Sequence, residues 1–308
     1  MKTNSSATFR IQGTPSECEL FFFLGGRLDS STIEAYAVLL FIAIMNIITC
    51  PITTVLNALK MFVVGTKPRL KTKSNVALGC LATTNGITGV IGQPLFIAQV
   101  TLILQGETSG VNCLVIQLAK YILRVLGAAS LFHLTFIMNL ERYIAINQLF
   151  TYVTIVTKSR ILCSSALAWI VALLLTVPLA IIDNNIYLAV SNITTSLCIA
   201  IIVYCQVVLY FEIRRHEKQI AAQQVSVEAR QKFFKEKKAF KLTTTVALIL
   251  ILTYSPIIVV RMLITRSVID PLVIILNSVI NPIIYCVRIR QFRIAFIEVV
   301  CRKSNTTS

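Results

Sequence analysis

The chain has 308 residues, of which 56% are hydrophobic and only 14% are charged, whereas an ordinary soluble domain is about a quarter charged. This composition excludes a soluble enzyme or binding domain and favours a membrane protein. The formal net charge of +16 could indicate a nucleic-acid partner, but no basic stretch lies in a soluble domain. We therefore expect no nucleic-acid partner. The excess of basic residues is expected in loops on the inner side of a membrane.

The first segment, residues 1–33, is polar over most of its length. It lacks a basic stretch followed by a short apolar run and a small-residue cleavage site, so we do not expect a cleaved signal peptide. The segment is predicted to be an extracellular N-terminus, and the first apolar run would then insert the chain into the membrane.

Long apolar runs follow in the region 34–287, each of a length that crosses a bilayer as a helix. They lie at about 34–63, 76–104, 113–141, 161–182, 194–213, 240–264 and 269–287. The runs are too long and too continuously apolar for the strands of a barrel, so helices must satisfy the backbone in lipid. The sequence predicts an all-α membrane protein with a seven-transmembrane helix bundle.

The basic residues are unevenly distributed among the segments that connect the apolar runs. Lys and Arg gather after the first, third and fifth runs and in the tail, whereas the other connections mix basic with acidic residues. The positive-inside rule then places the N-terminus outside and the C-terminus in the cytoplasm of a multi-pass plasma-membrane protein. The glycosylation sequons at Asn4 and Asn192 fall on the predicted outer side, whereas the sequon at Asn305 falls inside.

The last segment, residues 288–308, is predicted to be an amphipathic helix and a cytoplasmic tail. Phe292, Ile294, Phe296 and Ile297 alternate with basic residues, which is typical of a short helix that lies on the inner leaflet and contacts membrane lipids. Cys301 beside it is a candidate acylation site.

Polar residues inside apolar runs are costly, so their positions point to function. The third run ends in Glu141-Arg142-Tyr143, and the seventh contains Asn277-Ser278 followed by Asn281-Pro282 and Tyr285. With these two motifs in this order, the chain resembles the rhodopsin-like (class A) family of G-protein-coupled receptors. The second motif is expected to break the seventh helix at its proline.

Further family marks match in place over roughly residues 34–300. They are Asn57 in the first run, Ser74-Asn75 before the second, Trp169 and Pro178 in the fourth, Tyr204 in the fifth and Pro256 in the sixth. The resemblance implies a receptor without enzymatic chemistry or a cofactor, which passes the signal of an extracellular ligand to a heterotrimeric G protein.

The chain also departs from the family pattern. Asn85 replaces the acidic residue of the second span, so sodium modulation should be weak or absent, although Ser130, Asn277, Ser278 and Asn281 could surround a water cluster. Tyr254 stands at the usual tryptophan toggle before Pro256. Ile275 stands where opsins carry their lysine, so retinal binding is not expected.

The outer side departs from the pattern as well. The second outer loop, about 183–193, is short and has no Cys, which leaves Cys113 without its usual disulfide partner; Cys18 is one alternative. Together with the missing fifth-span proline, this resembles the melanocortin, adenosine, cannabinoid and lysolipid branch of the family.

The resemblance implies a latch at the inner end. Arg142 would pair with Glu141 and, across the bundle, with Glu236, and outward movement of the sixth helix would release it. Tyr204 and Tyr285 could then hydrogen-bond near Arg142. The alternative for Glu236, which stands among lysines, is a solvated charged face.

The ligand is less well defined by the sequence. Lys120 and Arg124 share one face of the third helix, and Arg261 could face them, which favours an anionic small molecule, lipid or peptide. The alternatives are neutralisation by Asp270 or Glu107 and, for Lys120, snorkelling to the headgroups.

Other functions remain open at this point. A membrane transporter also has polar residues in broken helices, but no repeat relates the two halves of this chain. A non-retinal sensory receptor is a further alternative. His133 is predicted to be a packed, hydrogen-bonded core residue rather than a metal ligand.

Overall fold

The structure is a computed structural model. It describes residues 32–68, 71–107, 110–147, 151–182, 184–222 and 269–288, together with scattered positions between 234 and 252 and between 293 and 297. Some side chains within these ranges lie outside the description. The sequence predictions that fall outside the described residues concern Asn4, Glu236, Tyr254, Pro256, Arg261 and Cys301.

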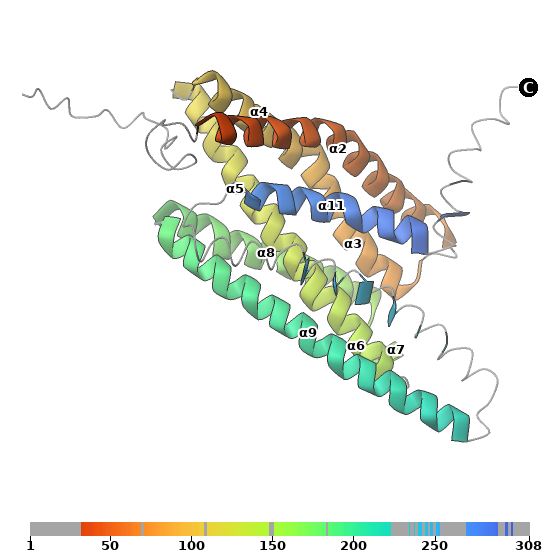
Figure 1. The fold of residues 1–308 in the computed structure, drawn as a ribbon. Helices are drawn as coiled ribbons and strands as arrows, with labels where there is room; N and C mark the ends of the chain where they lie inside the picture. The colour runs from red at the N-terminus through yellow and green to blue at the C-terminus, as the bar shows by residue number, and fades with distance from the viewer. Residues whose placement is uncertain are drawn as a thin grey trace, which may run out of the picture.

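Every regular element in the described part of the chain is helical. In chain order these are α2 (Thr32–Thr66), α3 (Lys73–Ile87), η2 (Thr88–Gly92), α4 (Gln93–Gln105), α5 (Gly110–Phe132), η3 (His133–Asn139), α6 (Leu140–Asn147), α7 (Tyr152–Ile155), α8 (Lys158–Ile182), α9 (Asn184–Ala222) and α11 (Ile269–Arg288). Figure 1 shows them as long rods packed side by side.

Five of the described rods are long and apolar enough to cross a membrane. They are Leu39–Thr66, Lys73–Gln105, Gly110–Asn147, Lys158–Pro178 and Ile186–Ile220. The helix α11 coincides with the seventh predicted run, and the described positions of the sixth run, between 240 and 252, are helical. The predicted all-α membrane bundle is thereby confirmed.

The rod formed by α5, η3 and α6 lies at the centre of the bundle (Figure 1). In its most apolar window 72% of the residues are buried within the protein, against 44% or less in the other four rods. It contacts α3, α4, α8, α9 and α11. A residue on this rod can therefore touch several other rods, which makes it the natural place for a shared site.

We call the end of the bundle that holds the start of α2 the outer end, and the end that holds Arg142 the inner end, after the predicted orientation. Apolar packing in the described residues forms separate clusters along the bundle. The outer apolar cluster includes Leu39, Phe96 and Ile275, the inner apolar cluster includes Leu81 and Leu131, and a third, smaller one contains Leu209. Polar side chains therefore occupy particular places between and beside these apolar clusters.

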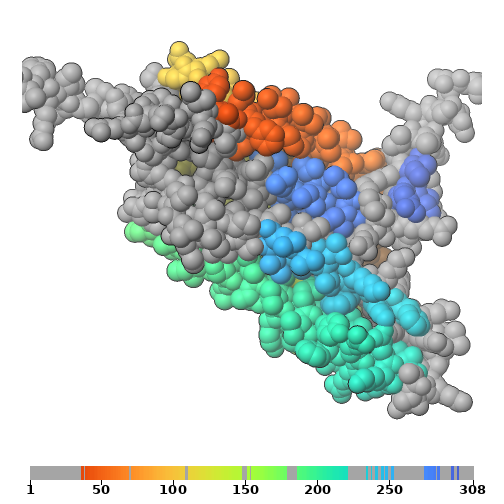
Figure 2. Space-filling model, viewed as in Figure 1, coloured from red at the N-terminus to blue at the C-terminus, as the bar shows by residue number. Residues whose placement is uncertain are grey.

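One face of the molecule brings the last helices together. Figure 2 shows α2, α11 and α9 along this face, with described residues from the segment between 234 and 252 lying between α11 and α9. The hydroxyl of Thr244 in that segment donates to Gln206 Oε1 of α9 at 2.8 Å. The sixth run therefore packs against the fifth at this level.

Two expectations about helix boundaries are wrong. The second outer loop was expected at about 183–193, but α9 begins at Asn184, so the fifth helix starts ten residues before the predicted 194. The apolar residues 186–190 extend the helix outward, and the polar Ser191 and Asn192 interrupt its hydropathy without interrupting its hydrogen bonding. A helix can continue beyond the lipid, which a hydropathy window cannot detect.

The seventh helix was expected to break at its proline, and this is also wrong. The backbone of α11 is helical from Ile269 to Arg288, through Pro282. α2 likewise continues through Pro51, and α8 contains Pro178. A proline removes one backbone donor from a helix, but neighbouring rods and the remaining bonds keep these helices continuous.

Two wide helical turns were not predicted. The π-helical turn η2 ends at Gly92, two residues before Pro94, whose ring nitrogen cannot donate to the carbonyl one turn earlier. The second turn, η3, contains Asn139, whose amide donates to Leu134 O at 2.7 Å. Such turns rotate the following residues about the helix axis, and the second one sets the direction of the residues that come next, Glu141 and Arg142.

Candidate functional site

The most densely connected group of charged side chains in the described bundle lies at the inner end. We call Ser74, Glu141, Arg142 and Tyr152 the inner cluster. Three different elements supply it: Glu141 and Arg142 come from α6, Ser74 from the first turn of α3, and Tyr152 from the first position of α7. The start of α3 is fixed by Thr72, whose hydroxyl accepts the backbone N–H of Asn75 at 3.3 Å.

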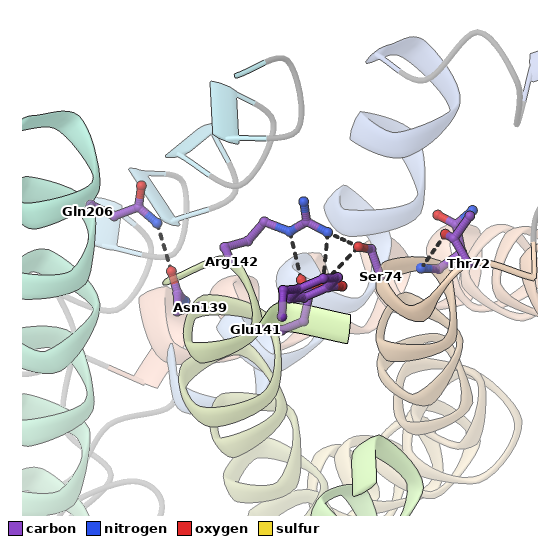
Figure 3. A network of polar contacts seen from close by, with 8 residues as sticks. Thr72, Ser74, Asn139, Glu141, Arg142 and Gln206 are labelled. Atoms are coloured by element: carbon purple, nitrogen blue, oxygen red, sulfur yellow. Dashed lines mark hydrogen bonds and ion pairs between the residues drawn. The ribbon is translucent and has the colours of Figure 1, made fainter. Parts of the chain in front are cut away.

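Arg142 and Glu141 form a buried ion pair. Arg142 Nε lies 2.7 Å from Glu141 Oε2, and Arg142 Nη2 donates to Glu141 Oε1 at 3.2 Å. The two residues are only 7% and 5% exposed. Neighbours in a helix point about 100° apart, so the guanidinium has to fold back over the carboxylate, as Figure 3 shows.

The same carboxylate oxygen collects further donors. Glu141 Oε1 accepts the hydroxyl of Ser74 at 2.8 Å and that of Tyr152 at 2.5 Å. Arg142 Nη2 also donates to Ser74 Oγ. Hydrogen bonds to a charged group are about twice as strong as neutral ones. The cluster therefore ties α3, α6 and α7 together around a single carboxylate.

The phenol of Tyr152 is held in its neutral, donating form. Burial, followed by the charge of Glu141, raises the pKa of Tyr152 above its ordinary value. Lys73 Nζ lies 5.0 Å from the centroid of its ring, within range of a cation–π contact. At neutral pH the Tyr152 hydroxyl is therefore a permanent donor to Glu141.

A second polar chain leaves the central rod on its other side. Gln206 of α9 donates from Nε2 to Asn139 Oδ1 at 2.7 Å, and its own Oε1 accepts the hydroxyl of Thr244. Figure 3 shows Asn139 pointing toward Gln206 while Arg142, one turn further along, reaches toward Ser74. Tyr143 packs beside them against the apolar cluster that contains Leu209. The inner part of the rod is thus linked to the helices on both sides.

Deeper in the bundle lies an amide network, which we define as Asn57, Asn85, Ser130, Asn277, Ser278 and Asn281. Every member is at most 3% exposed. Asn85 Oδ1 accepts the hydroxyls of Ser130 and Ser278, each at 3.4 Å. The structure thus brings together the five core polar residues singled out in the sequence, and Asn281 joins them.

The network continues along α11 and reaches α2. Asn277 Nδ2 donates to Ser130 Oγ at 3.1 Å, Asn281 Nδ2 donates to Asn277 Oδ1 at 3.1 Å, and Asn57 Nδ2 donates to Ser278 O at 3.2 Å. Gly127 permits this approach of α5 and α11, because a Cβ at that position would lie 2.8 Å from Ile274 Cδ1.

The amide network carries no formal charge. Asn57 Oδ1 and Asn85 Nδ2 are buried and form no hydrogen bond within the described part of the chain, so one acceptor and one donor remain for water. No group of three or more His, Cys, Asp or Glu side chains that could hold a metal occurs among the described residues.

At the outer end, Arg124 is covered by an aromatic ring. The guanidinium carbon lies 4.0 Å from the centroid of Tyr187, which belongs to the first turn of α9 and is 8% exposed. Lys120, one turn toward the outer end of α5, is half-buried. The sequence predicted the two cations on one helix face but missed Tyr187, because the segment around it was expected to be a loop.

The structure also contains buried polar residues that were missed in the apolar runs. Asn46 Oδ1 and the hydroxyl of Thr49 in α2 accept hydrogen bonds from Gln93 Nε2 of α4, at 3.3 and 3.0 Å. Lys60, 1% exposed, lies one turn beyond Asn57 in α2. An ionisable residue inside a span is itself a functional signal, and this one could have been found in the sequence.

Four further residues that the sequence analysis singled out lie on α9 and α11. Tyr204 lies on α9 and is 65% exposed, and its hydrogen bond near Arg142 stays a prediction. Pro282 and Tyr285 belong to the helical backbone of α11, and their side chains lie outside the description. Asn192 lies within helix α9 and is half-buried, rather than in a loop.

His133 is the packed, hydrogen-bonded core residue that was predicted. It is fully buried, and its ring nitrogens lie 2.7 Å from Ala129 O and 2.7 Å from Ser165 Oγ of α8. Cys113 at the start of α5 is disulfide-bonded, with a partner outside the described residues. A pairing with Cys18 therefore stays a prediction.

Comparison with known proteins supports the resemblance. Residues 56–188 match the family described as 7 transmembrane receptor (rhodopsin family). The matched region contains Asn57, Asn85, Ser130 and the inner cluster, and it covers less than half of the chain. No curated protein gives a significant match.

Proposed function

We propose that the chain is a rhodopsin-like G-protein-coupled receptor, which transmits the binding of an extracellular ligand to a heterotrimeric G protein. In this proposal residues 1–33 face the outside, residues 34–287 form the transmembrane domain and residues 288–308 lie in the cytoplasm. The family match over 56–188 and the apolar rods support it.

The observation that carries the proposal is the buried Glu141–Arg142 pair at the inner end of the central rod. A buried ion pair is rarely the most stable arrangement, since apolar residues of similar volume stabilise a fold as well or better. A pair placed beside the predicted cytoplasm is therefore suited to a switch: it holds one conformation, and its opening exposes a cation to a partner. Outward movement of the sixth helix would release Arg142 for this purpose.

The outer end supports an anionic ligand. Arg124 presents a planar guanidinium, a group suited to carboxylates and phosphates, and the ring of Tyr187 fixes its orientation. Lys120 on the same helix face adds a second positive charge. A ligand that combines an acidic group with an apolar body would pair its charge at Arg124 and bury its body in the outer apolar cluster.

The experiment that tests the proposal is guanine-nucleotide exchange by each Gα class in the presence of the purified protein in nanodiscs. The ligand panel contains carboxylic acids and acidic peptides, which Arg124 and Lys120 favour, together with lysolipids and nucleosides, which are ligand types of the family branch that the chain resembles. We expect at least one panel member to accelerate exchange. A protein that engages no Gα class, with or without ligand, would contradict the proposal.

Variants of Arg124 test the ligand class. Arg124→Ala should abolish the response to the active acid, and Arg124→Lys should weaken it because the charge remains while the planar, ring-stacked group is lost. Gln105→Ala, a change at an exposed position at the outer end of α4, serves as the control and should leave the response intact. An unchanged response in Arg124→Ala would remove the anionic-ligand part of the proposal.

A further inference from the structure

We propose that Gln206 is a positioning residue, which fastens the sixth run to the central rod in the closed conformation through a chain of neutral hydrogen bonds. We call Asn139, Gln206 and Thr244 the neutral relay. The inference rests on the proposed function and adds a closing contact that contains no charge and is separate from the Glu141–Arg142 pair. The sequence analysis gave none of the three relay residues a role.

The relay runs in one direction across three helical segments. Asn139 Nδ2 donates to Leu134 O at 2.7 Å, and since a carbonyl oxygen can only accept, this bond fixes which way the amide of Asn139 points. Asn139 Oδ1 is then the acceptor, and Gln206 Nε2 of α9 donates to it at 2.7 Å (Figure 3). Gln206 Oε1 is left as an acceptor in turn, and the hydroxyl of Thr244 donates to it at 2.8 Å. Gln206 therefore bonds the central rod and the sixth run at once.

Apolar packing shields the relay from the inner end. Asn139 is 3% exposed and Gln206 is half-buried. The third apolar cluster lies about one turn or more nearer the inner end on each helical segment, and its buried members are Ile146, Leu209, Ile213 and Phe240. Each of these four is at most 8% exposed. Water from the inner side is thus kept from the relay, and its bonds are stronger than the same bonds would be in water.

Thr244 has a second acceptor in its own helix. Its hydroxyl oxygen lies 2.8 Å from Gln206 Oε1 and 3.0 Å from Phe240 O, and a hydroxyl has only one proton to donate. When the sixth run moves outward, this proton can pass wholly to Phe240 O, so the movement leaves no buried donor without a partner. The contact is therefore reversible, as a contact that biases a two-state bundle must be.

A charged pair joins the same helices nearer the inner end. Lys237 and Glu217 form an ion pair, but their side chains are 29% and 31% exposed. Solvent screens a pair of this kind, and it contributes little to holding two helices together. It also links α9 to the segment just before the sixth run, whereas Gln206 reaches the central rod. We therefore assign the positioning role to Gln206.

The test compares two neighbouring threonines. Thr244→Val removes the hydroxyl that reaches Gln206 and keeps the branched shape. Thr245→Val is the matched control, because the hydroxyl of Thr245 donates at 2.9 Å to Lys241 O of its own helix.

Loss of one neutral hydrogen bond shifts a two-state equilibrium by about 2- to 10-fold. We expect agonist-free nucleotide exchange by a responsive Gα class to rise by this factor in Thr244→Val and to stay at the wild-type level in Thr245→Val. A residue needed only for folding would lower exchange when it is replaced. Exchange in Thr244→Val at or below the wild-type level would overturn the relay.

A second readout needs no G protein. Amide hydrogen exchange of residues 240–252 should accelerate in Thr244→Val but not in Thr245→Val, while exchange in α8 stays unchanged. Gln206→Met keeps a side chain of similar length and removes both of its bonds, so it should accelerate the same residues at least as much. Once Gln206→Met has removed the acceptor, adding Thr244→Val should change amide exchange far less than it does in the wild type.

The relay and the proposed function can fail separately. If Gln206→Met and Thr244→Val are coupled in amide exchange but no Gα class responds to any variant, the relay stands and the receptor function fails. If Thr244→Val and Thr245→Val have equal effects on amide exchange, the relay is overturned whatever the G protein does. Effects of Gln206→Met and Thr244→Val that simply multiply would overturn it as well.

Discussion

The inner cluster and the amide network lie on the same central rod but are built from different chemistry. The inner cluster holds a carboxylate and a guanidinium, and the contacts to Glu141 from Tyr152, Arg142 and Ser74 are 2.5–3.2 Å long. The amide network holds neutral groups, joined at 3.1–3.4 Å. Of these two groups, only the one at the inner end of the rod carries formal charge.

This difference follows from the cost of burying charge. A charged side chain becomes more expensive with depth in a bilayer, whereas neutral amides satisfy one another and accept water. A charged group near the boundary can be exchanged between internal and external partners, which suits a latch. A neutral group in the middle can change its bonds at little cost, which suits a connection that must rearrange when the latch opens.

Breaking the ion pair should give the largest effect. In Glu141→Ala the guanidinium of Arg142 stays buried without its carboxylate, and we expect a loss of about 3–5 kcal/mol in the free energy of unfolding. Thermal unfolding of the purified protein in detergent measures it. Glu141→Gln, which keeps the acceptor oxygen, should lose clearly less. Equal melting temperatures for Glu141→Ala and the wild type would show that the pair is not a buried interaction.

Adding a charge to the neutral network should give the next largest effect. Asn85→Asp would place a carboxylate among neutral neighbours, and we expect a loss of about 1–3 kcal/mol that sodium partly restores. The measurement compares melting temperatures in sodium chloride and choline chloride at equal ionic strength. The wild type should show no difference between the two salts. A sodium effect in the wild type would refute the neutral character of the network.

Much of the contrast between the inner cluster and the amide network could be predicted from the sequence. The spans followed from hydropathy, and the resemblance to the receptor family indicated that Asn57, Asn85 and Asn277 share a polar core. Glu141 and Arg142 were found because charges at the end of an apolar run are conspicuous. These features are local in the sequence or belong to a known pattern of spacing.

Other parts could not be predicted because they depend on tertiary contacts. Nothing near Tyr152 in the sequence indicates that its hydroxyl reaches Glu141 across the second inner connection. Asn139 and Gln206 are 67 positions apart, and only the packing of α9 on the central rod brings them together. Tyr187 was missed for a different reason, because helix α9 extends beyond the apolar run that hydropathy detects.

Alkaline pH should have a smaller effect, and it should lower the stability contributed by the inner cluster but not that contributed by the amide network. Since burial and Glu141 raise the pKa of Tyr152, the folded protein retains this proton more tightly than the unfolded chain does. The contribution of Tyr152 to stability is then complete below the ordinary tyrosine pKa of about 10, and it is lost as pH rises through the higher folded value.

The measurement is the melting temperature between pH 8 and pH 11 in the wild type and in Tyr152→Phe. The stability difference between the two should shrink toward the alkaline end of this range. The amide network contains no group that titrates there, so Asn277→Ala should remain parallel to the wild type. A difference that is constant over the whole range would contradict the raised pKa.

The smallest expected change in stability concerns Lys73, which lies beside the inner cluster. Lys73→Met keeps an apolar stem but removes the charge over the Tyr152 ring, and we expect a loss of about 0.5–1 kcal/mol. Lys71→Met, at an exposed neighbouring position, is the control. Chemical denaturation resolves such a change if both variants are measured together. A loss in Lys71→Met as large as that in Lys73→Met would assign the effect to general charge instead of the ring contact.

A latch that faces a cytoplasmic G protein requires the inner cluster to lie on the cytoplasmic side of the membrane. Glu107→Cys follows α4 at the outer end, and Lys158→Cys begins α8 at the inner end; both native residues are exposed. A membrane-impermeant maleimide applied to intact cells should label Glu107→Cys above the background of the native cysteines, and should label Lys158→Cys only after permeabilisation. Labelling of Lys158→Cys in intact cells would place Arg142 on the outside and contradict a latch that faces a cytoplasmic G protein.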